Sequence, residues 1–194
     1  MKNLVPLVVY MHDGGVVAGG PKTDDISFRA VALHCGVVVL NVEYRLAPEN
    51  KSPVECQRSY DVVNWSRLSV DLDEGFILGA TSAGANFATR PSRFFASHAD
   101  EAESRQKLSL PLKDLLFFAP SVCHSDARPD QYKDCILSVD EVNDAPRLTR
   151  KSIGYLAGKC GAPPTDRRVS PLRFPPNTVF TTKSLIQVWL GSAS

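Results

Sequence analysis

Short apolar runs alternate with longer amphipathic segments, and this alternation restricts the fold of the chain more than any other feature. Residues 4–11 and 36–42 are rich in valine and leucine at consecutive positions, which is typical of parallel strands buried on both faces. Residues 24–35 lie between them and predict a helix whose apolar face consists of Ile26, Ala30, Val31 and His34. The order of these segments predicts an α/β fold, a doubly wound and mostly parallel sheet with flanking helices.

The rest of the chain continues the same pattern, with one exception. Further strands are expected at 75–78, 115–119 and 185–190, and further helices at 83–98 and from Pro53 onward. The exception is the segment 121–168, which is polar and contains four prolines and no strand pattern. Such a long strandless stretch predicts a lid or cap inserted over a site within one domain spanning 1–194.

The charge balance argues against a nucleic-acid partner, and the lengths of the apolar runs argue against a membrane span. The 22 lysines and arginines against 21 acidic residues give a net charge of +1, with no basic cluster, and we therefore expect no nucleic-acid partner. No run of about 18 apolar residues occurs, so no membrane span is expected. The apolar run near the start is short and interrupted by Pro6, which favours a strand over a signal peptide.

The cysteines indicate a reducing compartment. There are five, an odd number with no CxxC pair, at Cys35, Cys56, Cys123, Cys135 and Cys160. This arrangement predicts reduced, buried thiols rather than disulfides or a metal site, and a cytoplasmic location.

The strand expected at 75–78 runs into a turn of small residues that contains Ser82. A nucleophile elbow holds a serine on such a tight turn between a strand and a helix, and requires small residues two positions before and after the serine. Gly84 meets this requirement, and Ala80 replaces the usual first glycine. Taken alone, the pattern also fits a serine in an ordinary strand–helix turn.

A second short motif, His12-Asp13-Gly14-Gly15, follows the first expected strand. Glycines let the backbone come close to a substrate, so its N–H groups can stabilise a developing oxyanion. A simple glycine-rich turn is the alternative. A phosphate-binding loop is disfavoured because neither a GxGxxG nor a GK[ST] pattern is present.

Four segments in this order resemble the hormone-sensitive-lipase-like α/β hydrolases, the fold-3 carboxylesterases. They are the loop 12–15 (HGGG in the family), 44–49 (YRLAPE), the elbow 80–84 (GDSAGG type) and 170–172 (SPL). The resemblance implies an α/β-hydrolase fold, here incomplete at both ends. It also implies an ester hydrolase that forms an acyl-enzyme, with a small-molecule ester as substrate and with no cofactor or metal.

The resemblance assigns roles to individual residues. Ser82 matches the nucleophile, and Gly14, Gly15 and Ala83 match the backbone donors of the oxyanion hole. Asp13 stands where the family loop has its first glycine, which would restrict the loop or bring a carboxylate near the acyl group. We expect Arg45 and Glu49, from the segment 44–49, to form structural pairs beneath the site.

The acid and the histidine of the family's catalytic triad follow a late strand, and neither segment is found after 185–190. We therefore expect impaired hydrolysis, and a non-catalytic ligand-binding pseudo-enzyme on the same fold is the alternative. Among the histidines of this chain, His34 is expected in the core and His98 too far along its helix. His124, with Asp126 nearby, is the one candidate to replace the missing base, although an ordinary loop histidine is the favoured interpretation.

Phenylalanines near the expected site suit an apolar substrate or a helix core equally well. They are Phe87, Phe94 and Phe95.

Overall fold

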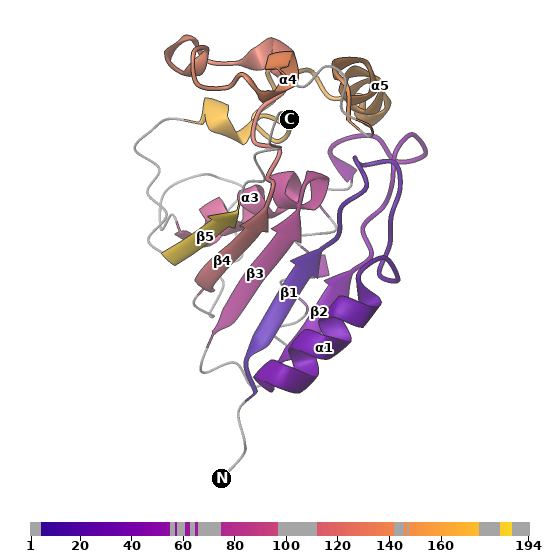
Figure 1. Cartoon of the computed structure of the whole chain (residues 1–194), viewed down its shortest axis with the longest axis vertical. Coiled ribbons are helices and arrows are strands. Elements are labelled where there is room, and N and C mark those ends of the chain that lie inside the picture. Colours follow the sequence, from indigo (N-terminus) through magenta and orange to yellow (C-terminus); the bar gives the residue numbers. More distant parts are fainter. Residues whose placement is uncertain are drawn as a thin grey trace.

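A computed structural model describes residues 5–54, 57, 61, 62, 65, 75–96, 112–141, 146, 148–174 and 183–187. Within these residues, five parallel strands form one sheet in the order β2-β1-β3-β4-β5 (Figure 1). The strands are β1 (Leu7–Met11), β2 (Val38–Val42), β3 (Phe76–Thr81), β4 (Leu112–Phe118) and β5 (Lys183–Gln187). The prediction of a parallel α/β sheet is confirmed.

The strand order reverses direction between β1 and β3. From β1 the chain moves to β2 on one side, and it then crosses back to β3 on the other side of β1. In open α/β sheets, ligands bind beyond the carboxyl ends of the strands at such a reversal. Met11 pairs with Ala80 in the register of these two strands, so the segments that follow them, which begin at His12 and Ser82, leave the sheet side by side.

In the described part of the chain, helix α1 (Asp25–Cys35) lies in front of the sheet and α3 (Ala83–Ala96) lies behind it in Figure 1. The core contains side chains from the central strands and from α3, including Val9, Met11, Leu78 and Phe87, each at most 1% exposed. Phe87 therefore belongs to the core, and the side chains of the other two predicted phenylalanines, Phe94 and Phe95, lie outside the described residues.

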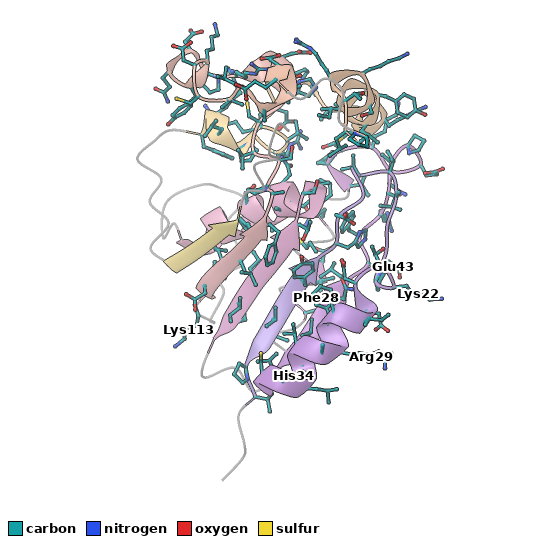
Figure 2. The ribbon with its side chains drawn as sticks, in the orientation of Figure 1. Lys22, Phe28, Arg29, His34, Glu43 and Lys113 are labelled. Carbon is teal, nitrogen blue, oxygen red and sulfur yellow. The ribbon has the colours of Figure 1, made fainter. Side chains whose placement is uncertain are left out.

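The predicted apolar face of α1 is wrong. No residue of α1 is buried, and Ile26 is 85% exposed. The helix contacts the sheet instead through Phe28, which is labelled in Figure 2. The ring centroid of Phe28 lies 4.4 Å from that of Tyr10 in β1. His34, expected in the core, is exposed and its Nδ1 atom hydrogen-bonds to the carbonyl of Ala30 at 2.8 Å.

Two further expectations about burial need correction. β2 is only partly buried, and Val38 is 44% exposed, because β2 is the edge strand of the described sheet. The described cysteines are all free, but Cys35 and Cys135 are exposed rather than buried. Cys56 lies outside the described residues.

The segment 121–168 contains no strand among its described residues. It forms short 3-10 helices η1 (Ser125–Ala127) and η2 (Asp130–Tyr132) and the helices α4 (Ser138–Glu141) and α5 (Arg150–Cys160), and the 3-10 helix η3 (Pro171–Arg173) follows. These elements lie beyond the carboxyl ends of the strands (Figure 1). An ion-pair network joins α4 to its surroundings, since Asp140 pairs with Arg128 and, at 2.7 Å, with Arg150.

Parts of three predicted elements lie outside the described residues. Residues 54, 57, 61, 62 and 65 are helical, as expected after Pro53, and the residues between them are not described. Residues 97–98, which include the candidate His98, also lie outside the described residues, and so do residues 188–190. No helix in the described part of the chain is long and apolar enough to cross a membrane.

Candidate active site

Ser82 directly follows β3 and adopts a left-handed backbone conformation, with a φ angle of 52°. This region is uncommon for residues other than glycine, and the strain is typical of functional turns. The backbone N–H of Ser82 donates to the carbonyl of Phe118 at 2.9 Å, and the Ser82 carbonyl accepts from the N–H of Asn86 at 3.3 Å. The turn is thus fixed by the end of β4 and by the first turn of α3.

Gly84 packs directly against the backbone that leaves β1. A Cβ atom at this position would lie 2.4 Å from the carbonyl oxygens of both Met11 and His12, so no side chain fits. Ala80, on the other side of the serine, is completely buried, which shows that its methyl group is accommodated. The structure therefore brings the turn of Ser82 and the loop of His12 into backbone contact.

The loop 12–15 depends on its glycines for its shape. Gly14 has a φ angle of 121°, and its carbonyl accepts hydrogen bonds from the N–H groups of Val17 at 3.2 Å and Ala18 at 3.0 Å. A Cβ atom at Gly14 would lie 1.9 Å from the carbonyl oxygen of Ala18. Gly15 also has a positive φ angle, 61°, and faces the side chain of Leu156.

Tyr44 supports this loop from the protein interior, a role that the sequence did not predict. Its hydroxyl donates to the carbonyl of His12 at 2.8 Å and lies 3.3 Å from that of Asp13. Its ring stacks on the imidazole of His12, with centroids 4.1 Å apart. Burial raises the pKa of Tyr44, so its hydroxyl remains a donor. The signal in the sequence was a tyrosine two residues after Val42, the buried last residue of β2.

Arg45 and Glu49 do not form the expected pairs beneath the site. Both side chains are exposed, and neither has a hydrogen bond or an ion pair with another described residue. The segment 44–49 instead contacts the loop through Tyr44 and through the N–H of Ala47, which donates to the carbonyl of Val16 at 2.9 Å.

Asp13 lies half-buried in the loop and affects the ionisation of its neighbours. Burial raises the pKa of Asp24, and the negative charge of Asp13 raises it further. Burial is also the main cause of the raised pKa of Tyr10, whose hydroxyl hydrogen-bonds to that of Thr81 next to the elbow. The charge of Asp13 therefore acts on Asp24 and Tyr10, and its position relative to an acyl group stays a prediction.

Asn86 joins α3 to the segments that contain Ser121 and Val169, a role that was not predicted from the sequence. It is 7% exposed, and its Nδ2 donates to the carbonyls of Ser121 at 2.7 Å and Val169 at 2.9 Å. Ser170, which follows Val169 in the chain, is fully buried. Its hydroxyl donates to the carbonyl of Pro164 at 2.6 Å and accepts from the N–H of His124 at 3.0 Å.

The described histidines hydrogen-bond to nearby backbone groups and not to Ser82. His12 Nδ1 lies 2.6 Å from the carbonyl of Asp13, and His124 Nδ1 accepts from the N–H of Asp126 at 3.1 Å. His12 Nε2 is buried and has no partner among the described residues. The base that would activate the serine is therefore not identified within the described part of the chain.

Comparison with known proteins agrees with this geometry. A family model described as alpha/beta hydrolase fold matches residues 8–190. An AB hydrolase superfamily protein of Schizosaccharomyces pombe is 29% identical over 174 residues, which cover 87% of this chain and 49% of that protein. Versiconal hemiacetal acetate esterase of Dothistroma septosporum is 27% identical over 142 residues, which cover 71% of this chain and 41% of the esterase.

Solved structures give the same result. Vibralactone cyclase superposes with a TM-score of 0.80 at 26% identity, over 98% of this chain and 64% of the cyclase. The esterase of Pyrobaculum calidifontis superposes with a TM-score of 0.76, also at 26% identity, over 94% of this chain and 57% of the esterase. The chain thus spans about half the length of the curated relatives and about three fifths of the solved ones.

Proposed function

Because the chain belongs to the alpha/beta hydrolase fold family, whose model matches residues 8–190, we propose that it is a carboxylic ester hydrolase with Ser82 as its nucleophile. Two relatives that support this reaction class are the versiconal hemiacetal acetate esterase and an arylesterase of Saccharolobus solfataricus, 33% identical over 91 residues. The observation that carries the proposal is the strained turn at Ser82 packed through Gly84 against the loop of His12.

In the proposed reaction the Ser82 hydroxyl oxygen attacks the carbonyl carbon of the ester while a base takes its proton. Backbone N–H groups of Gly14, Gly15 and Ala83 stabilise the negative charge that develops on the carbonyl oxygen. The carbon–oxygen bond to the alcohol then breaks, the alcohol leaves with a proton, and an acyl-enzyme remains. Water adds to this acyl-enzyme, releases the carboxylic acid and restores the hydroxyl.

The rate of this reaction depends on the base and its orienting carboxylate. Removing triad members from a serine protease costs up to about 10⁶-fold in turnover, and the oxyanion hole and substrate binding retain roughly 10³–10⁴-fold over water. We therefore propose that this chain alone hydrolyses esters weakly. Sequencing the 3′ end of the transcript tests the point, because a downstream aspartate and histidine would complete the triad.

Two subsidiary proposals concern the arrangement and location of the protein. We propose that 121–168 forms a lid on a single domain spanning 1–194, supported by its position beyond the carboxyl ends of the strands (Figure 1). We also propose a cytoplasmic location, supported by the four described cysteines, Cys35, Cys123, Cys135 and Cys160, all of which are free.

Labelling with an alkyl fluorophosphonate tests the role of Ser82. The reagent phosphonylates activated serines with loss of fluoride, and peptide mass spectrometry locates the adduct. In a full-length version that carries the acid and the histidine, we expect modification at Ser82, none in Ser82→Ala, and unchanged labelling in Ser27→Ala, a matched control because Ser27 is an exposed serine of α1. A well-folded full-length version that is not modified at Ser82 would overturn the hydrolase and favour a non-catalytic ligand-binding protein.

A further inference from the structure

Leu156 of α5 lies directly on the loop that carries the proposed oxyanion donors. A Cβ atom built on Gly15 would be 2.7 Å from Leu156 Cδ1 and 3.3 Å from Leu156 Cδ2. The two methyl groups therefore occupy the space on this side of Gly15, and a side chain there would require Leu156 to move, in addition to adopting the unfavourable φ angle of 61°. Leu156 is half-buried, so part of it remains open to an incoming molecule.

Both ends of α5 are fixed. At its start, Thr149 and Ser152 form a capping box, with the Ser152 N–H donating to Thr149 Oγ1 at 3.1 Å. At its end, the carbonyl of the buried Cys160 accepts from the N–H of Ser52 at 3.0 Å.

The contacts at the C-terminal end of α5 hold the helix beside the loop. Gly161, which follows α5, lies against the side chain of Lys51, because a Cβ atom there would be 2.9 Å from Lys51 Cδ. Leu156 precedes Cys160 by about one helical turn. The backbone of α5 at Leu156 therefore cannot move away from the loop unless these contacts break.

We propose that Leu156 determines substrate specificity by restricting the acyl group of the ester to a small one, acetyl in preference to a bulky or aromatic acyl group. This inference rests on the proposed oxyanion hole. An oxygen bound by the Gly15 N–H lies about 1.2 Å from its carbonyl carbon, so the atoms attached to that carbon come within a few ångströms of Gly15. The Leu156 methyl groups lie against Gly15 and therefore border that space.

The test replaces Ser82 with cysteine and measures access to position 82 without requiring catalysis. Alkyl methanethiosulfonates transfer their thioalkyl group to a thiolate, which forms a disulfide while sulfinate leaves. Methyl and benzyl methanethiosulfonate are compared on the full chain, and peptide mass spectrometry counts the modification at position 82 alone. Exposed Cys35 reports the intrinsic reactivity of each reagent in the same sample.

In Ser82→Cys we expect the benzyl reagent to react much more slowly than the methyl reagent at position 82, relative to Cys35. Adding Leu156→Ala should raise the benzyl-to-methyl ratio about tenfold, and Leu156→Val should raise it by a smaller factor. Tyr155→Ala is the matched control, because Tyr155 is the preceding residue of α5 and is 63% exposed, and it should leave the ratio unchanged.

Equal ratios in the parent and both Leu156 variants would overturn the proposal, as would a benzyl reagent that already reacts freely with the parent. A position 82 that reacts with neither reagent in any variant would overturn it too, because the thiol would then be inaccessible. Failure of the proposed hydrolase appears separately, as absent fluorophosphonate labelling of the unaltered Ser82, since disulfide exchange needs only an accessible thiol.

Discussion

Replacing Tyr44 with phenylalanine removes one hydroxyl group from beneath the loop 12–15 and leaves the ring in place. Tyr44 is 2% exposed, and its hydroxyl donates to the carbonyl of His12 at 2.8 Å. The phenylalanine ring can still stack on the imidazole of His12, 4.1 Å away in the parent. The substitution therefore isolates the hydrogen bond from the packing.

The expected cost follows from burial of the acceptor. A buried polar group that loses its partner costs about 1–3 kcal/mol. The carbonyl of His12 also lies against the backbone of Gly84, which leaves little room for a water molecule to replace the hydroxyl. We therefore expect the free energy of unfolding to fall by about 1–3 kcal/mol, and a looser loop to slow fluorophosphonate labelling of Ser82 by about tenfold.

Urea unfolding at pH 7 and the labelling rate measure the two effects. Tyr155→Phe is the control, because Tyr155 is 63% exposed and a surface substitution of this kind changes stability by about 0.5 kcal/mol or less. If Tyr44→Phe matches this control in both stability and labelling rate, the loop does not depend on the Tyr44 hydroxyl and the reasoning is refuted.

Three further predictions test other contacts. Gly84→Ala places a methyl group 2.4 Å from two backbone oxygens and should destabilise the fold severely. The control Gly154→Ala adds a methyl group in open space on α5 and should stabilise the fold by about 1 kcal/mol. Equal urea midpoints for the two variants would contradict this prediction. Asn86→Ala leaves two carbonyls without their donor and should cost about 2–3 kcal/mol in the same assay; a loss below 0.5 kcal/mol, roughly that of a surface change, would contradict it. Burial and the charge of Asp13 raise the pKa of Asp24, so the ionised carboxylate lowers the stability of the fold as the pH rises through that pKa. Asp24→Asn should therefore stabilise the protein at pH 7 and not at pH 3. An equal effect at both pH values would disprove the raised pKa of Asp24.

The sequence determined the parts of this protein that depend on local chemistry. Alternating apolar runs and amphipathic segments predicted the parallel sheet, because a strand and a helix each impose a spacing on their buried residues. The small residues around Ser82 predicted a tight turn, and the structure shows that Gly84 is required there because backbone oxygens occupy the space of its side chain.

Contacts between distant segments were decided only by the tertiary structure. The sequence pattern favoured Arg45 and Glu49 as supporting residues, whereas Tyr44 makes the buried hydrogen bond to His12, 32 residues away in the chain. It also assigned an apolar face to α1 that the structure leaves exposed. Periodicity states which residues share a side of an element, but which side is buried depends on what the rest of the chain places against it, and no local spacing contains that information.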